Sequence, residues 1–276
     1  MLSQCSETFG RHRRLSAEIH HSSTPFSRVA TCVLGLCLCV VAGCGGSGGE
    51  KRPDVSGSIG DRCRAGSFHR LGSARSAYAA IVRSNATVAS RPGGTPFARF
   101  HRRNVNGAPT IFSIRGAIVD AACRPSAYLV QVPRRPNGVT GWVAAARVTV
   151  GTVRTRIVVD LSRKQVTLYR DGREVLRATA AIGARATPTP TGRFYVNQRL
   201  IPADPNGPYG PGAVGISAFS DVLTGWTQGG PIAIHGTNAP WSIGKAVSNG
   251  CIRLPNETLR RVFSEALAGT PVLIRR

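Results

Sequence analysis

The chain has 276 residues, a hydrophobic content of 42% and a formal net charge of +23 at pH 7. This composition excludes a wholly disordered chain, and the length allows two modest domains and a tail. The basic residues are nearly all arginines, because the only lysines are Lys51, Lys164 and Lys245. A basic surface suits anionic partners such as nucleic acid, lipid headgroups or wall polymers, or it is simply solvated.

Residues 1–43 have the pattern of a targeting segment rather than of a domain. Several arginines precede an uncharged apolar run of fourteen residues at 29–42. The run is too short for a comfortable membrane span but has the length of a signal-peptide core. It ends in V-A-G-C at Cys44, which resembles the bacterial lipobox, in which the cysteine is lipidated and becomes the mature N-terminus.

We therefore predict a lipoprotein signal peptide at 1–43, lipidation of Cys44 and an extracytoplasmic protein that is anchored to the cell membrane and faces the cell wall. An ordinary signal peptide and an uncleaved anchor are the alternatives. Export argues against nucleic acid as a partner and leaves membrane lipid and anionic wall polymers. The glycine- and serine-rich residues 44–61 are expected to form a flexible linker.

The cysteines fit an exported protein. Four of the eight would be lost with the signal peptide, and Cys44 would carry lipid. If Cys251 keeps its thiol for catalysis, Cys63 and Cys123 are the natural disulfide pair outside the cytosol. The mature sequence has no C-x-x-C spacing, so we expect no zinc site built from cysteines.

Residues 62–150 are predicted to form a small β domain. Short runs of β-forming residues, separated by Gly, Pro and Asn, recur at 79–82, 110–112, 128–132 and 142–143. The closing sequence V-P-R-R-P-N-G-V-T-G-W-V-A, with V-R-S-N-A-T-V near the start, resembles a bacterial SH3-like domain, and we predict a small SH3-like β barrel. The resemblance implies docking to peptidoglycan or orienting the following domain. A packing spacer without a ligand is the alternative.

The next segment has the pattern of a β meander. β-rich runs at 156–160 and 165–169 precede the hairpin signal Asp171-Gly172, which leads into a third run at 174–182. The proline-rich stretch 187–192 cannot pair as a central strand, and it precedes a strand at 193–196.

A long loop rich in glycine and proline is predicted at 201–215, around Tyr209. A loop of this length is uncommon in a compact domain unless it is functional. The alternative is a mobile surface loop.

One amphipathic helix is predicted near the C-terminus. Asn256 is its expected N-cap and Gly269 is placed to end it. The apolar positions follow helical spacing, at Leu259, Val262, Phe263, Ala266 and Leu267. A last strand is expected at 271–274.

The candidate catalytic residues are a histidine and a cysteine. His235 follows a short apolar strand at 231–234, and Cys251 comes sixteen positions later, after Gly250. A thiol becomes a good nucleophile when a base removes its proton. Gly250 lets the backbone approach a substrate carbonyl, whose oxyanion the nearby N–H groups would face. The alternative is a small buried cysteine and a structural histidine.

The strings H-G-T at 235–237, S-I-G-K-A-V at 242–247 and S-N-G-C-I-R-L at 248–254 resemble the active-site signature of the L,D-transpeptidase catalytic domain family, which is also called YkuD-like. The resemblance extends upstream through V-V-D-L-S, A-T-P-T-P-T-G and G-P-Y-G-P-G and covers about 154–274. Many members have S-H-G-C, whereas this chain has Asn249 at the second position. We expect Asn249 to affect the reaction rate and the hydrogen bonds of the site rather than the class of reaction.

The resemblance implies a mainly β protein, in which a YkuD-like β-sandwich catalytic domain with one clear C-terminal helix occupies 154–276. It implies that Cys251 is the nucleophile, His235 the general base and acid, and Gly250 a backbone donor to the oxyanion. It implies no metal and no organic cofactor. The substrate-binding residues that it suggests are Gly236, Tyr209, Ser248, Asn249 and Arg253.

The implied reaction is peptidoglycan L,D-transpeptidation. Cys251 attacks a stem tetrapeptide, D-alanine leaves, and the acyl group passes to an amine of another stem, giving a 3-3 cross-link. The resemblance also implies acylation by carbapenem-type β-lactams. Two alternatives stay open: an L,D-carboxypeptidase that uses water as acceptor, and a non-catalytic wall-binding lipoprotein in which residues 62–150 are the working part.

Overall fold

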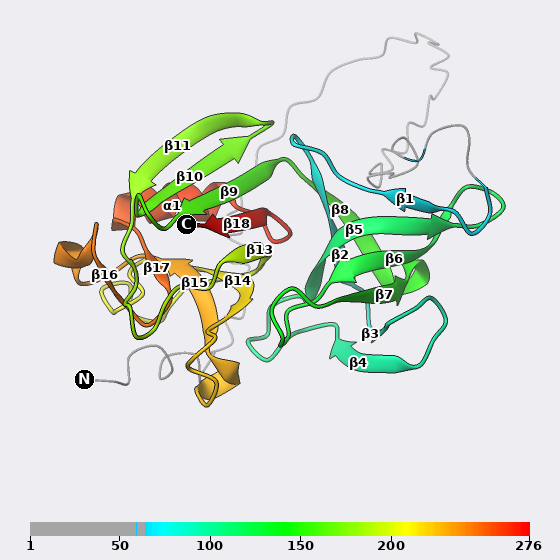
Figure 1. Cartoon of the computed structure of the whole chain (residues 1–276), viewed down its shortest axis with the longest axis horizontal. Coiled ribbons are helices and arrows are strands. Elements are labelled where there is room, and N and C mark those ends of the chain that lie inside the picture. Colours follow the sequence, from blue (N-terminus) through cyan, green and yellow to red (C-terminus); the bar gives the residue numbers. More distant parts are fainter. Residues whose placement is uncertain (1–58, 60–63) are drawn as a thin grey trace, which may run out of the picture. The chain divides into compact units, whose positions relative to one another are not determined.

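The computed structural model describes residue 59 and residues 64–276. The predicted signal peptide, Cys44, Cys63 and all of the predicted linker except Ile59 lie outside the described residues. Within them the chain is mainly β, with one α-helix, which confirms that part of the predicted fold class (Figure 1). In this part of the chain no helix is long and apolar enough to cross a membrane.

The first eight strands form one antiparallel sheet in the order β4-β3-β7-β6-β5-β2-β8, with β1 paired to β5. Each of the four β-forming runs expected between 79 and 143 lies wholly or largely in one of these strands. The SH3-like character of the region stays a prediction. The strands are β1 (Phe68–Arg70), β2 (Ala77–Val82), β3 (Asn85–Ala89), β4 (Pro96–His101), β5 (Ile111–Val119), β6 (Pro125–Gln131), β7 (Thr140–Ala144) and β8 (Val148–Val153).

A second eight-stranded sheet has the order β11-β10-β9-β18-β13-β14-β15-β17. The pairs β18–β9 and β15–β17 are parallel, and the other pairs are antiparallel. The strands are β9 (Thr155–Asp160), β10 (Gln165–Arg170), β11 (Arg173–Thr179), β13 (Gly192–Leu200), β14 (Ala213–Phe219), β15 (Pro231–His235), β17 (Ile252–Arg253) and β18 (Pro271–Arg275).

The remaining elements are short. β12 (Ile182–Gly183) pairs in parallel with β16 (Ala246–Ser248). The single α-helix of the described residues, α1, spans Asn256–Glu265. Short 3₁₀ turns occur at Ala145–Arg147, Thr227–Gly229 and Pro240–Ser242.

The predicted hairpin turn is present between β10 and β11. Asp171 and Gly172 both have positive φ, at 51° and 81°. Two consecutive residues in this conformation are typical of a two-residue hairpin turn whose twist matches that of the strands. The third β run was predicted too long, because β11 ends at Thr179 and residues 182–183 belong to β12. After β11 the chain leaves the second sheet, and β12 pairs with β16 instead. No local sequence pattern predicts this change of partner.

The helix packs its apolar face onto the second sheet. Leu259 and Val262 are fully buried in the core cluster that also holds Ile157, Phe194 and Ile234. Burying a side chain of this size contributes roughly 1.5–3 kcal/mol. The helix is shorter than predicted: it ends at Glu265, Ala266 leaves the helical conformation, and Leu267 is exposed.

The prediction that Asn256 caps this helix is wrong. Pro255 occupies the N-cap position and no side chain caps the helix. Asn256 is the first helical residue, and its Oδ1 accepts a hydrogen bond of 2.7 Å from the backbone N–H of Thr237. The side chain therefore joins the helix start to the segment that follows β15.

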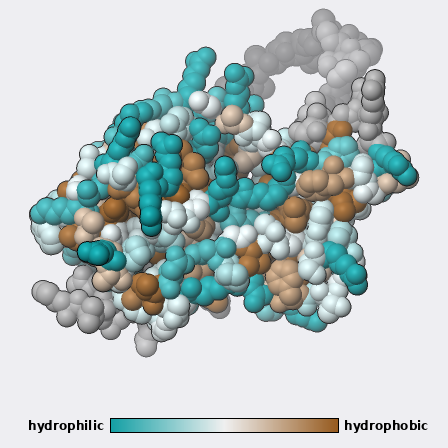
Figure 2. Space-filling model, in the orientation of Figure 1, coloured by the Kyte–Doolittle hydropathy of each residue, from teal (hydrophilic) through white to brown (hydrophobic). Residues whose placement is uncertain are grey.

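The two large sheets belong to one compact unit and contact each other directly. The Tyr195 hydroxyl of β13 donates to the Ile111 carbonyl of β5 at 3.0 Å, and the Gln131 amide of β6 donates to the Arg193 carbonyl at 2.9 Å. The face of the molecule in Figure 2 is mostly hydrophilic, with small apolar patches between polar side chains.

Candidate active site

The site is formed where two parallel strands meet at the end of the second sheet. β15 pairs with β17 through Ile234–Ile252 and His235–Arg253. This register places Cys251, which directly precedes β17, beside the strand that ends in His235. Both side chains are buried, with exposed fractions of 3% each. A cysteine and a histidine that are separated by sixteen positions therefore share one buried region.

The His235 ring is fixed by its own neighbour. Its Nδ1 lies 2.6 Å from the carbonyl oxygen of Gly236. A carbonyl can only accept a hydrogen bond, so Nδ1 carries the hydrogen and Nε2 presents its lone pair. Among the described residues, Nε2 is buried and has no hydrogen-bond partner. The arrangement suits a neutral imidazole that takes a proton at Nε2.

The protonation state of His235 agrees with this tautomer. Burial is the main cause that lowers its pKa to about 4. The hydrogen bond to Gly236 acts in the opposite direction, and the positive charge of Arg253 lowers the pKa further. Desolvation disfavours the charged imidazolium, so the ring is neutral at pH 7.

Tyr209 lies against His235. The two rings meet edge to face, with centroids 5.0 Å apart, and Tyr209 is buried. It belongs to the long loop predicted at 201–215, whose last residues the structure assigns to β14, so the loop itself is 201–212. Asn256 Oδ1 lies against this loop, because a Cβ on Gly210 would come within 2.4 Å of that atom. The Tyr209 segment and the His235 segment are thus packed around one side-chain oxygen.

Hydrogen bonds between residues close together in the chain hold the loop before Cys251. Ser248 Oγ donates to the Cys251 carbonyl at 2.5 Å and accepts from the Gly250 N–H at 3.2 Å. Gly250 has φ of 108°, a region that L side chains rarely adopt. Because its N–H is directed to Ser248 Oγ, a substrate oxyanion would have to compete for that donor.

Two threonines that sequence reasoning did not single out support the same loop. Thr189 Oγ1 donates to the Gly250 carbonyl at 2.8 Å and accepts from the Gly183 N–H at 2.9 Å. Thr187 Oγ1 donates to the Ser248 carbonyl at 2.9 Å. The sequence predicted only that the T-P-T-P-T-G string cannot pair as a central strand, whereas the alternate spacing of its threonines is the signal that indicates this role.

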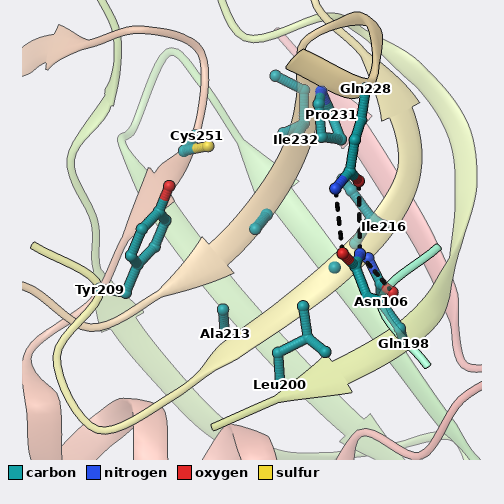
Figure 3. A pocket seen from close by; sticks show the side chains of 12 residues that line it. Asn106, Gln198, Leu200, Tyr209, Ala213, Ile216, Gln228, Pro231, Ile232 and Cys251 are labelled. Carbon is teal, nitrogen blue, oxygen red and sulfur yellow. Dashed lines mark hydrogen bonds between the residues drawn. The ribbon is translucent and has the colours of Figure 1, made fainter. Parts of the chain in front are cut away.

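Cys251 and Tyr209 line the same pocket, whose empty space amounts to about 430 Å³ only when the open solvent at its mouth is counted. Figure 3 shows these two side chains on one side and polar amide side chains on the other. The other described lining residues are Asn106, Gln198, Leu200, Ala213, Gly215, Ile216, Gln228, Pro231, Ile232 and Ala233. Sequence reasoning missed the three amides, which carry no local motif.

The other predicted substrate-binding residues do not line this pocket. Ser248 is buried and its hydroxyl is used within the Cys251 loop. Gly236 is buried, and a Cβ there would lie 2.4 Å from Asn256 Oδ1. Asn249 and Arg253 are half-buried, and the Nε atom of Arg253 has no hydrogen-bond partner within the described residues. Arg253 lies beside His235 in the sheet and influences its pKa.

Two further features concern cysteines and metals. Cys123 is disulfide-bonded, whereas Cys251 carries a buried thiol. The predicted partner of Cys123, Cys63, lies outside the described residues, so that pairing stays a prediction.

In the part of the chain that the structure describes, His, Cys, Asp and Glu side chains form no group that could hold a metal ion.

Comparison with known proteins shows which class has this site. The family model of the L,D-transpeptidase catalytic domain, YkuD, matches residues 154–274. A putative L,D-transpeptidase YkuD of Bacillus subtilis is 38% identical over 125 residues, which cover 45% of this chain and 68% of the relative. The probable L,D-transpeptidase YcfS of Escherichia coli is 33% identical over 106 residues, which cover 35% of this chain and 30% of the relative.

Solved L,D-transpeptidases are also similar, at lower identity. L,D-transpeptidase 3 of Mycobacterium tuberculosis is 18% identical with a TM-score of 0.38, covering 60% of this chain and 92% of that one. The L,D-transpeptidase LdtMt1 in complex with imipenem is 17% identical with a TM-score of 0.37, and the match covers 54% of this chain and 90% of that one. On the sequence relationship to the Bacillus relative, the chain belongs to the L,D-transpeptidase catalytic domain family.

Proposed function

We propose that this protein is a peptidoglycan L,D-transpeptidase in which Cys251 is the nucleophile and His235 is the general base and acid. The observation that carries the proposal is the state of His235. The ring is buried and neutral, its Nδ1 is tied to the Gly236 carbonyl, and its Nε2 has no partner in the described structure. It shares this buried region with Cys251, whose thiol lines the pocket.

The first half of the reaction is acylation. The Cys251 thiol gives its proton to His235 Nε2, and the thiolate attacks the carbonyl of a peptide bond in the stem tetrapeptide. A C–S bond forms and the carbonyl oxygen becomes an oxyanion, which backbone N–H groups near Gly250 and Cys251 stabilise. The C–N bond then breaks, and D-alanine leaves with the proton that His235 had taken.

The second half is acyl transfer. An amine of another stem attacks the thioester carbonyl and gives a proton to His235. The C–S bond breaks, the new amide is the 3-3 cross-link, and the proton returns to the sulfur. With water in place of the amine, the same steps give a shortened stem, which is the L,D-carboxypeptidase alternative.

The low pKa of His235 sets the resting state of the pair. A base whose conjugate acid has a pKa of about 4 does not hold the thiol proton in the free enzyme. Proton transfer is therefore concerted with attack on the substrate, when imidazolium and developing negative charge stabilise each other. General base catalysis of this kind contributes roughly 10²–10⁴ to a rate.

The location of the enzyme is part of the proposal. The signal pattern at 1–43 and Cys44 support a lipoprotein that reaches the wall across the linker 44–61, with peptidoglycan stems as substrate. Anionic wall polymers are suitable partners for a chain of net charge +23. Mass spectrometry of the N-terminus of the cellular protein tests the anchor: a chain that begins at Cys44 and carries fatty acyl groups on it is expected, and an unmodified Cys44 would disprove lipidation.

Intact-mass spectrometry of the full chain with imipenem tests the nucleophile. Imipenem is the probe because a solved L,D-transpeptidase contains it. The expected result is a mass increase of one drug molecule that is absent in Cys251→Ala and slowed in His235→Asn. No adduct on a folded wild-type protein, or an adduct that persists in Cys251→Ala, would overturn the assignment of Cys251.

Incubation with a stem tetrapeptide identifies the acceptor. Release of D-alanine with a cross-linked dimer supports transpeptidation, whereas release with only a tripeptide supports the carboxypeptidase. Full binding to isolated wall without any release of D-alanine would instead favour the non-catalytic lipoprotein.

A further inference from the structure

Three amide side chains, from Asn106, Gln198 and Gln228, line one wall of the Cys251 pocket, and a fourth, Asn104, is hydrogen-bonded to Gln198. Asn104 and Asn106 lie on the loop between β4 and β5, and Gln198 and Gln228 come from the second sheet and its β14–β15 connection. Asn104 Nδ2 donates to Gln198 Oε1 at 2.8 Å, and Asn106 Nδ2 donates to the same oxygen at 3.1 Å. Gln228 Nε2 donates to Asn106 Oδ1 at 3.0 Å (Figure 3). We call these four residues the amide cluster.

Gln198 Nε2 is the amide nitrogen of the cluster that donates no hydrogen bond within the described residues. Gln198 Oε1 accepts from two side chains, which uses both of its lone pairs. Its Nε2 has no hydrogen-bond partner among the residues that the structure describes, and Gln198 lines the pocket. Two donors on Oε1 also polarise the amide, so that Nε2 becomes a better donor.

The amide cluster is held from the side of the first sheet. Gln228 has φ of 57°, in the left-handed region that non-glycine residues seldom adopt. The segment that carries it is fixed at both ends, since Arg135 donates to the carbonyls of Ser220 and Gly229, the latter at 2.8 Å. Asn137 exchanges two hydrogen bonds with the backbone of Phe219, at 2.8 and 2.9 Å. The first sheet thus supplies part of the pocket wall and positions the rest.

The chemistry of the pocket selects a neutral ligand group. Its floor is aliphatic, from Leu200, Ala213, Ile216 and Ile232, and none of its described lining residues is charged. A carboxylate or an ammonium group would lose its hydration there without an opposite charge to compensate. A peptide carbonyl can instead accept a hydrogen bond from Gln198 Nε2 while its flanking atoms lie on the apolar floor.

We propose that the amide cluster is a subsite that binds a backbone carbonyl oxygen of the acyl-donor peptide through Gln198 Nε2, with Asn104 and Asn106 of the first sheet holding Gln198 in that orientation. This inference rests on the proposed function, because it names the part of the site that binds the donor. It gives the first sheet a role in the reaction that does not require it to bind the wall itself.

Gln198→Glu is the sharpest test, because it replaces only the Nε2 donor. The two carboxylate oxygens still accept from Asn104 and Asn106, so the cluster stays joined, but the pocket gains an acceptor that repels a carbonyl. The expected result is a KM for the stem tetrapeptide raised about tenfold or more, since the hydrogen bond is lost and the new oxygen repels the carbonyl. The value of kcat is expected to change by less than about threefold.

A second variant and a control separate the subsite from general damage. Asn106→Ala frees Gln198 to rotate, and a smaller rise in KM is expected. Asn85→Ala is the matched control, because Asn85 is an exposed asparagine of the same sheet that pairs with His101 and does not line the Cys251 pocket. Alkylation of Cys251 by iodoacetamide, which needs no subsite, is expected at the same rate in all variants.

Binding measurements keep this inference distinct from the proposed function. Calorimetry with the tetrapeptide is done on Cys251→Ala, with and without Gln198→Glu, so that it does not depend on turnover. Weakened binding in the double variant supports the subsite even if the wild type releases no D-alanine, in which case only the proposed function fails. Equal binding and an equal KM in the Gln198→Glu and wild-type proteins would overturn the subsite while the proposed function stands.

Discussion

His235 Nδ1 lies 2.6 Å from the carbonyl oxygen of Gly236, the next residue in the chain. In a Ser-His-Asp triad a carboxylate holds the histidine and stabilises the imidazolium that forms during the reaction. Here a neutral carbonyl holds the tautomer, and it adds less stabilisation to the charged ring. That difference is consistent with a pKa lowered to about 4 by burial. In the proposed mechanism, His235 would therefore become charged in the substrate complex rather than in a preformed ion pair with the thiolate.

The first prediction concerns the pH dependence of stability. His235 has a pKa of about 4 in the folded protein and 6.5 as its ordinary value. Between these values the unfolded chain binds a proton that the folded protein does not, so the free energy of unfolding falls as the pH decreases from about 6.5 to about 4. At roughly 1.4 kcal/mol per pKa unit, His235 alone accounts for about 3 kcal/mol. Above pH 7 it contributes no slope.

The measurement is denaturant unfolding at several pH values for the wild type and for His235→Asn. The asparagine keeps a donor for the Gly236 carbonyl but does not titrate. The stability difference between the two proteins is expected to shift in favour of the variant by about 3 kcal/mol between pH 6.5 and pH 4. A difference that stays constant over this range would show that burial does not lower the pKa of His235.

The second prediction concerns the backbone at Gly250. Gly250→Ala places a methyl group 2.9 Å from Ile232 Cδ1 and forces alanine to adopt φ of 108°. Backbone strain of this kind costs about 1–3 kcal/mol, so we expect lower stability and slower acylation of Cys251 by imipenem. Gly225→Ala is the control, because its Cβ would meet nothing within 4 Å. Equal thermal midpoints and acylation rates in the two variants would contradict the strained conformation of Gly250.

Sequence patterns predicted the turns and helix faces that depend on interactions between residues close together in the chain. The Asp171-Gly172 turn and the buried face of α1 follow from dihedral preferences and side-chain spacing within a few residues. The site was found through a motif whose residues lie in one stretch of chain. Each of these signals is contained in a short window, so a single sequence is sufficient to detect it.

The features that sequence reasoning missed depend on contacts between distant segments. The side chain of an asparagine at position 256 suits either an N-cap or an acceptor for a distant backbone group. Only the fold shows that its Oδ1 accepts a hydrogen bond from the N–H of Thr237. Asn106 reaches Gln198, which lies 92 positions later. A polar residue in a loop has no periodicity that would indicate such a partner, because the pairing is set by how the sheets pack.

The third prediction concerns the hydroxyl of Thr189. In Thr189→Val the carbonyl of Gly250 and the N–H of Gly183 both lose a buried partner. Each unsatisfied buried group costs about 1–3 kcal/mol, so we expect a clear loss of stability and slower acylation. Thr189→Ser keeps the hydroxyl and is expected to stay within about 1 kcal/mol of the wild type. If the valine and serine variants unfold at the same denaturant concentration, the hydroxyl does not support the Cys251 loop.

The fourth prediction concerns the link between α1 and the His235 segment. Asn256→Ala leaves the N–H of Thr237 without its 2.7 Å acceptor, two residues from His235. We expect a loss of about 1–3 kcal/mol in unfolding free energy and slower reaction with imipenem. Asn256→Asp retains an oxygen at the acceptor position and is expected to react close to the wild-type rate. An alanine variant with unchanged stability and rate would show that this hydrogen bond does not position the segment.

The last prediction concerns the partner of Cys123, which is disulfide-bonded. Trypsin does not cleave before Pro125, so a digest places Cys123 in residues 116–134 and Cys63 in the dipeptide 63–64. Without reductant we expect the joined mass of these two peptides, and reductant is expected to separate them. Cys63→Ser and Cys123→Ser should then destabilise the protein equally, by about 2–4 kcal/mol. A peptide 116–134 joined to any other cysteine would disprove the pairing, because one cysteine forms only one disulfide.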